Sequence, residues 1–404
     1  MQRDMPADTP AAPAASRLVP RLISGTVIAL AVATVAVIAL TWPGARPVAS
    51  PPGQRFATVL ATATAIETEA CPVEDPRGCT RARIRIADGS HAGDTGSFVI
   101  GDHRSDIRVQ VGDRVRVIRT PDKQMNVPGV EVERWSFSDY DRHLPLIWLG
   151  LAFVVVVLVA GRWRGLRALI GLGLSVGVVL GYIVPGLLRG DNALLITCAG
   201  AVAVMYLTIP LAHGWGLTTK AATLGTAASL GVTVVLALAF TSLAHLTGFG
   251  SDDAAYLASA AGNVSIRGLL LGGIVIATLG VLDDVTITQA STVLALRHAN
   301  PELGYGELFA RALSVGRDHI TATINTLVLA YAGASLPALL VFAVVDIPVS
   351  DVLNGENVAS QIVGTLVGSI GLITAVPITT ALAALLATHV SPEEIDPHEG
   401  HVHG

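Results

Sequence analysis

The stretch that decides the fold runs from Gly268 to Leu296 and reads GLLLGGIVIATLGVLDDVTITQASTVLAL. It is long and apolar enough to cross a bilayer as a helix, since about 20 apolar residues span the hydrocarbon core. Two adjacent carboxylates, Asp283 and Asp284, interrupt it well inside its length. A charged carboxylate near the bilayer centre costs at least about 2.5–3.5 kcal/mol, so it faces a protein interior, a water-filled cavity or a partner. This stretch is therefore the leading candidate for a functional site.

The composition of the whole chain points to the same class of protein. Its 404 residues are 51% hydrophobic and only 14% charged. Several further apolar runs exceed the length needed to cross a bilayer, which predicts a polytopic α-helical protein surrounded by lipid. The formal net charge is -5, and no basic stripe is present to neutralise phosphates. Nucleic acid is therefore not an expected partner.

About eight transmembrane helices are expected. The apolar runs cover residues 22–42, 144–160, 168–188, 193–212, 221–245, 268–296, 320–345 and 358–387. Basic residues such as Arg162, Arg164 and Lys220 fall in alternate loops. Because basic loops stay in the cytoplasm, this pattern places both the N-terminus and the C-terminus there.

The expected domain order follows from these runs. Residues 1–21, rich in Pro, Ala and Ser, are read as a disordered cytoplasmic tail, and residues 22–42 as a transmembrane anchor. Residues 43–142 form an extracytoplasmic β-domain. A seven-helix transmembrane domain occupies residues 143–388, and residues 389–404 form a cytoplasmic tail that contains histidines.

The expected β-domain shows short alternating runs at residues 56–66, 81–87, 97–100, 107–119 and 130–137. Turn signals such as Asp88-Gly89 separate them. About five strands in this length fit either a small OB-like barrel or a small sandwich. An OB-like fold does not by itself imply oligonucleotide binding. Cys71 and Cys79 lie close enough in sequence to close a small disulfide loop, provided that this segment lies outside the cytoplasm.

The two intramembrane acids cannot act as a matched pair on one face of a helix. Adjacent helical residues diverge by about 100°, so Asp283 and Asp284 point to different surroundings. Thr288 and Gln289 continue the polar character along the same helix. One interpretation is a buried carboxylate that holds helices together. The other, which we favour, is ion or proton handling, because two acids are more than packing requires.

A second polar group begins at GRDHITATINT, from Gly316 onward. Asp318, Thr321 and Asn325 follow each other at helical spacing, and Asn325 must find a hydrogen-bond partner within the membrane. We expect this stripe to face the helix of the two acids and to form a polar path with it. The candidate path residues are Asp283, Asp284, Thr288, Gln289, Arg317, Asp318, Thr321, Asn325 and Thr326.

The C-terminal tail carries His398, His401 and His403 at short spacing, which suits zinc, nickel or copper. The alternative is a disordered tail in which these histidines are incidental. The chain contains no GxxxxGK[ST] phosphate loop and no recognisable pair of nucleophile and base. An enzyme is therefore not expected, and no cofactor is indicated.

Several segments together resemble the YibE/F-like family of bacterial integral membrane proteins. They are FSDYDRHLPL, HGWGLTTKAATLGTAASL, GVLDDVTITQAS and GRDHITATINTLVLAYAGASLP, spread over about residues 135–385. The resemblance implies a plasma-membrane protein with an extracytoplasmic N-terminal region, and it brings no mechanism. The residues that match the family motifs are Asp283 or Asp284, Arg317, Asp318, Asn325 and Thr326. His319 stands where an apolar residue is commoner, which argues against an essential histidine.

Two functions remain open at this point. The first is a secondary transporter or channel for an ion or small solute, with the acids and the polar stripe lining its path. The second is a non-transporting scaffold whose extracytoplasmic β-domain binds a protein of the cell envelope.

Overall fold

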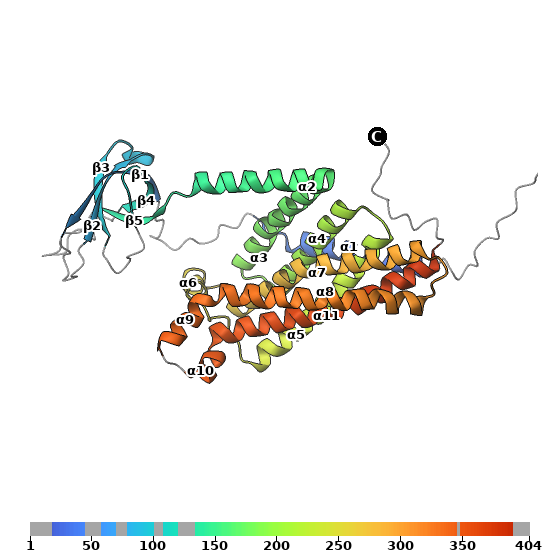
Figure 1. Cartoon of the computed structure of the whole chain (residues 1–404). Coiled ribbons are helices and arrows are strands. Elements are labelled where there is room, and N and C mark those ends of the chain that lie inside the picture. Colours follow the sequence, from blue (N-terminus) through green and yellow to red (C-terminus); the bar gives the residue numbers. More distant parts are fainter. Residues whose placement is uncertain are drawn as a thin grey trace, which may run out of the picture. The chain divides into compact units, whose positions relative to one another are not determined.

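The computed structural model describes residues 18–44, 58–69, 79–100, 108–119, 134–345 and 348–390. Two compact units divide the chain: Met1–Ser50 with Gly161–Gly404, and Pro51–Ala160. The first is a helical unit and the second contains all the described strands (Figure 1). The far N-terminal tail, Cys71, His398, His401 and His403 lie outside the described residues.

Five antiparallel strands build a β half-barrel, which confirms the expected small all-β domain. They are β1 (Thr58–Glu69), β2 (Cys79–Ile86), β3 (Thr95–Ile100), β4 (Arg114–Arg119) and β5 (Trp135–Tyr140), in the order β3-β2-β1-β4-β5. Alternation in β2 buries Ala82, Ile84 and Ile86 on one face. A methyl group on Gly96 of β3 would overlap the Trp135 ring of β5, so the two edge strands approach each other and the sheet curls.

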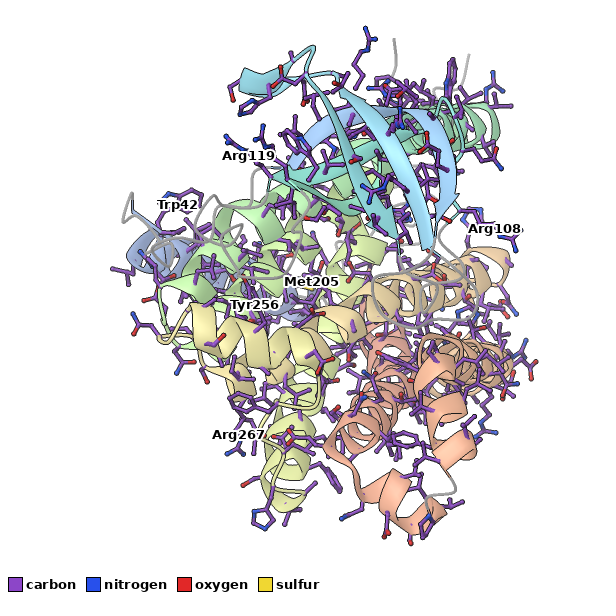
Figure 2. The ribbon with its side chains drawn as sticks, turned by 90° about the vertical axis from the view of Figure 1, so that its left-hand side faces the viewer. Trp42, Arg108, Arg119, Met205, Tyr256 and Arg267 are labelled. Atoms are coloured by element: carbon purple, nitrogen blue, oxygen red, sulfur yellow. The ribbon has the colours of Figure 1, made fainter. Side chains whose placement is uncertain are left out.

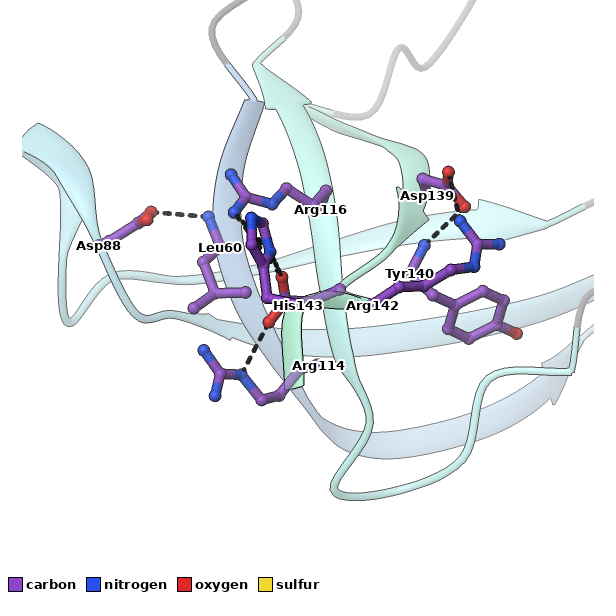
Figure 3. Close-up of polar contacts among 9 residues, drawn as sticks. Leu60, Asp88, Arg114, Arg116, Asp139, Tyr140, Arg142 and His143 are labelled. Atoms are coloured by element: carbon purple, nitrogen blue, oxygen red, sulfur yellow. Dashed lines mark hydrogen bonds and ion pairs between the residues drawn. The ribbon is translucent and has the colours of Figure 1, made fainter. Parts of the chain in front are cut away.

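An ionic cluster holds the end of β5 where the chain enters the next helix. The Asp141 side chain is 3% exposed, and His143 Nδ1 lies 2.6 Å from its Oδ1. Arg114 Nε and an Arg116 guanidinium nitrogen lie 3.3 and 3.6 Å from the same carboxylate. Figure 3 shows these three basic side chains gathered at the junction. The cluster therefore ties β4 to the start of the helix that follows β5.

The remaining elements are helical. They are α1 (Leu18–Thr41), α2 (His143–Val178), the π-helical η4 (Val179–Ile183), α3 (Val184–Leu188), α4 (Ala193–His213), α5 (Leu217–Leu243), α6 (Asp252–Ala260), α7 (Ile266–Ala299), α8 (Tyr305–Ala334), α9 (Leu336–Val345), α10 (Val349–Asn354) and α11 (Glu356–His389). A short 3-10 turn, η2 (Gly89–His91), precedes β3. Among the described residues, six helical stretches are long and apolar enough to cross a membrane. A seventh arises if α8 and the helix after it form one bent span.

The stretch from His143 to Leu188 breaks at Arg162, whose φ of 49° and ψ of -128° are not helical, so it consists of two legs, in agreement with the two apolar runs expected there. Helix α8 begins at Tyr305, well before the apolar run expected from residue 320. Its first turns are ordered because Leu308, Ala312 and Gly316, one helical turn apart, are buried against the neighbouring helices.

Helix α7 lies at the centre of the helical unit, between α4, α5, α8 and α11. Its side chains Val275, Leu282 and Val285 are almost fully buried and join one large core with Met205 of α4. Figure 2 shows Met205 among the helices, whereas Arg267 near the start of α7 extends from the edge. The stretch from Gly268 to Leu296, with its two acids, therefore belongs to the central helix of this unit.

Glycines set the spacing between the central helices. A methyl group on Gly225 of α5 would overlap the Thr379 hydroxyl of α11, and one on Gly371 of α11 would overlap the Thr233 hydroxyl of α5. Likewise, a methyl group on Gly272 of α7 would lie 2.7 Å from Thr197 Oγ1 of α4. Small residues at such positions allow close backbone approach, which drives helix association where lipid removes the hydrophobic incentive.

The first prediction concerns this packing. We expect Gly225→Ala to destabilise the helical unit by about 1–3 kcal/mol, the usual range for an overpacked core. The matched control is Gly231→Ala on the same helix, where a methyl group would meet nothing within 4 Å. Thermal unfolding in detergent should show a lower melting temperature for the first variant only. Equal melting temperatures would contradict the interlocked packing.

The second prediction concerns pH and the Asp141 cluster. The hydrogen bond with His143, together with the charges of Arg114 and Arg116, lowers the pKa of Asp141 below its ordinary 3.8, although burial acts in the opposite direction. The stabilisation from a lowered pKa is fully present above pH 3.8. It is lost as the pH falls through the folded-state pKa.

Asp141→Asn should therefore lower the urea midpoint of the half-barrel at pH 7 and reduce its change between pH 7 and about pH 3. Hydrogen exchange of the β4 and β5 peptides in the full-length protein reports both midpoints. Asp139→Asn is the control, because its ion pair with Arg142 is exposed on both sides and contributes little. An unchanged acid dependence in Asp141→Asn would refute the assignment.

Candidate functional site

A cavity of about 390 Å³ lies within the helical unit, between the second leg of α2, η4, α4 and α7. We call it the Asp283 cavity. Its lining residues are Arg167, Ala168, Gly171, Leu172, Ser175, Val179, Ile183, Ala201, Val204, Thr208, Ala212, Ile276, Leu279, Gly280 and Asp283. Most of these side chains are apolar, so the few polar groups determine its chemistry.

Asp283 is half-buried on the wall of this cavity. Thr208 Oγ1 of α4 lies 3.2 Å from Asp283 Oδ2 and donates to it. The other carboxylate oxygen, Oδ1, is buried and has no hydrogen-bond partner among the described residues. A buried, unpartnered carboxylate oxygen is costly, so it has a strong tendency to take up a proton or a cation.

Arg167 is the other charged residue that lines the cavity, and its guanidinium group lies over the ring of Trp163. Its guanidinium carbon lies 5.7 Å from the centre of the Trp163 ring, one turn earlier on α2. This arrangement is a cation–π contact. No ion pair joins Arg167 to Asp283 among the described residues. Arg167 and Asp283 are therefore separate features of the same cavity.

Closely packed side chains close the end of the cavity at η4. A methyl group on Gly200 of α4 would overlap Ile183, so this side chain is seated directly against the α4 backbone. The Tyr182 hydroxyl lies 2.7 Å from Thr41 Oγ1 of α1, and its ring stacks with Trp42 at 6.1 Å. Single π-helical turns such as η4 are frequent at functional sites. The π-helical segment thus carries the closure of the cavity.

Arg189 reinforces this closure from the end of α3. It donates to the backbone carbonyls of Thr41 and Trp42 at 3.0 and 3.2 Å, and it pairs with Asp191. These carbonyls belong to the last turn of α1 and the residue after it, where helical partners are missing. The ends of α1 and α3 are therefore joined beside Tyr182.

The second acid, Asp284, lies on a different face of α7, as the 100° rotation per residue requires. It is exposed, as are Thr288 and Ser291 along the same face. The Thr288 hydroxyl donates to the Asp284 carbonyl of its own helix at 2.7 Å. Neither Asp284 nor Thr288 lines the Asp283 cavity.

Gln289 joins α7 to neighbouring helices and does not line the Asp283 cavity. Its side-chain nitrogen donates to the Ala312 carbonyl of α8 at 2.9 Å and to Thr380 Oγ1 of α11 at 2.7 Å. One turn away, the hydroxyls of Thr286 on α7 and Thr226 on α5 are 2.7 Å apart. These bonds join α7 to three neighbours inside the core.

The expected polar stripe lies on the outer side of α8. Arg317, Asp318, Thr321, Asn325 and Thr326 are all exposed, and the two threonine hydroxyls donate to carbonyls of their own helix. The structure therefore does not bring this stripe together with Asp283, which lies on the side of α7 toward α4. The reason is that α8 turns its small buried face, Ala312 and Gly316, toward α7 and α11, while α4 occupies the side of α7 that carries Asp283.

Sequence reasoning missed the partners of Asp283. Thr208 is one hydroxyl within the apolar run at residues 193–212, and nothing in the run distinguishes it. Arg167 closely follows Arg162 and Arg164, so the sequence places it in the same basic turn rather than on a cavity wall. The remaining metal and disulfide candidates, His398, His401, His403 and Cys71 with Cys79, involve residues outside the described part of the chain. Within the described part, no group of three or more His, Cys, Asp or Glu is placed to hold a metal ion.

Comparison with known proteins adds one finding. The family model described as YibE/F-like protein matches residues 149–389, more than half of the chain. The chain belongs to the YibE/F-like family. No curated protein and no solved structure matches it. The matched region contains every residue that lines the Asp283 cavity and excludes the strands of the half-barrel.

Proposed function

We propose that this YibE/F-like protein is a secondary transporter or channel for an ion or small solute, and that Asp283 binds the transported species. The observation that carries the proposal is the buried, unpartnered Oδ1 of Asp283 at the wall of an apolar cavity. A carboxylate in such surroundings is stable only when a proton or cation neutralises it. Helix packing alone does not require this arrangement.

The proposed topology has eight spans in the bacterial plasma membrane, with both termini in the cytoplasm. Six apolar stretches become seven with the bent span of α8 and α9, and eight when His143–Leu188 is divided at Arg162. Arg164, Lys220 and Arg297 then fall at the same side of the bilayer, in agreement with the positive-inside rule. The half-barrel, which we infer to be OB-like, lies outside the cytoplasm between α1 and α2.

The same topology gives the cavity a direction. Its Arg167 end lies toward the cytoplasm, and its η4 end, with Tyr182 and Ile183, lies toward the outside. The cavity then represents an inward-facing state whose outer side is closed by the π-helical segment. Transport requires an alternative state in which this segment moves away from Gly200 and exposes Asp283 to the outside.

The third prediction tests the role of the carboxylate. Asp283→Asn keeps the shape of the side chain and removes its charge, so we expect flux to fall at least tenfold, roughly to the level of protein-free liposomes. Proteoliposome assays with H⁺, K⁺ and tetramethylammonium as probes measure this flux. Asp318→Asn is the matched control, since Asp318 is exposed on α8 and does not line the cavity.

Full flux through Asp283→Asn, with normal protein level and insertion, would contradict the proposal. Loss of flux in Asp318→Asn alone would instead indicate that the transport path runs along the outer face of α8.

A scaffold function is the second candidate, and the separate folding unit of the half-barrel supports it. In that case the extracytoplasmic β-domain binds an envelope protein and the helices serve as a platform. The transporter proposal differs because its cavity lies wholly within the helical unit.

The fourth prediction separates the two candidates. Deletion of residues 53–138 should leave at least about a tenth of wild-type flux, because no cavity residue is removed. A scaffold should instead lose its whole cellular function with this deletion. Complete loss of flux in a deletion variant that inserts into the membrane and melts at the wild-type temperature would contradict the transporter proposal.

A further inference from the structure

The size of the Asp283 cavity limits what it is built to hold. Its volume is about 390 Å³, whereas one water molecule occupies about 30 Å³ in the liquid. Pockets for small organic ligands begin at roughly 300 Å³. A proton or a bare inorganic ion would leave most of this space unfilled. The cavity therefore matches an organic molecule.

The walls exclude an ion that keeps its water or needs several oxygen ligands. Leu172, Ile276 and Leu279 are typical of the lining. The Ser175 hydroxyl donates to the Gly171 carbonyl at 2.9 Å, and the Thr208 hydroxyl is shared between the Val204 carbonyl and Asp283. Hard cations such as Ca²⁺ require six to eight oxygen ligands, which these walls do not offer. Apolar substituents suit them better.

The charges of the cavity select the sign of the ligand. Asp283 Oδ1 is buried and unpartnered, so an electrostatic partner there must be positive. The guanidinium of Arg167 is drawn over the Trp163 ring and makes no ion pair with Asp283 among the described residues. One unbalanced carboxylate is matched by a single positive charge.

We propose that the Asp283 cavity binds an organic monocation with apolar substituents, as its transported species. This inference rests on the proposed function in taking the cavity as the transport site. The apolar groups fill the space between α2, α4 and α7, and the positive centre lies beside Asp283 Oδ1. Dispersion and burial provide affinity, while the carboxylate provides discrimination by charge.

The fifth prediction uses two ligands that differ only in charge. Phenyltrimethylammonium is permanently positive, and tert-butylbenzene is its neutral isostere. We expect the full-length protein in nanodiscs to bind the cation at least tenfold more tightly than the neutral compound, after subtraction of binding to empty nanodiscs. Sodium at a hundredfold excess over the cation should not displace it. Equilibrium binding by calorimetry measures all three.

A matched pair of variants completes the test. Asp283→Asn should weaken binding of the cation at least tenfold and leave binding of the neutral isostere unchanged, whereas Asp318→Asn should change neither. Equal affinity for both ligands, displacement by sodium, or full cation affinity in Asp283→Asn would overturn the inference. Charge-selective binding without any flux would instead refute the transport proposal and leave the ligand class standing.

Discussion

The close contact between glycines and threonines of α4, α5, α7 and α11 is the interaction on which the helical unit depends. In a bilayer, apolar side chains gain nothing by leaving lipid for another helix, so association depends on close packing and polar contacts. Gly225, Gly272 and Gly371 each receive a threonine side chain from the facing helix. Thr197 and Thr233 donate to carbonyls four residues earlier at 2.6 and 3.0 Å, so their buried hydroxyls are satisfied within their own helices. The Thr379 hydroxyl is buried against Gly225 without a hydrogen-bond partner among the described residues.

Along the face of α7 that packs on α4, the close contact at Gly272 gives way about three turns later to the cavity at Asp283. The second leg of α2 approaches α4 at Gly171, where a methyl group would have room at 3.8 Å, and again near η4, where Ile183 is seated against Gly200. Between these points the two helices leave space. Asp283 therefore lies where the closely packed helices α4 and α7 meet the second leg of α2.

The sequence predicted the broad fold because its signals are local. Apolar length predicted the long helices, and alternation predicted five short strands in an all-β domain, which the structure confirms. It also separated Asp283 from Asp284, because rotation along a helix is fixed by backbone geometry. The neighbours of each acid could not be predicted, since the choice between α4 and α8 depends on which faces pack elsewhere. Gln289, expected along a path, instead bonds within the core to Ala312 of the next helix and to Thr380 of α11, which is distant in sequence.

The two acids lie in different surroundings because of that packing. Asp283 is half-buried on the wall of the cavity, so its carboxylate contacts whatever occupies the cavity. Asp284 is turned to a face of α7 that the described helices leave uncovered, together with Thr288 and Ser291. A single rotation of about 100° thus separates a carboxylate that belongs to an internal site from one that belongs to the outer surface. Asp283 and Asp284 are neighbours in the sequence, but their side chains lie in different surroundings. Each acid therefore has to be interpreted from the side of α7 on which it lies.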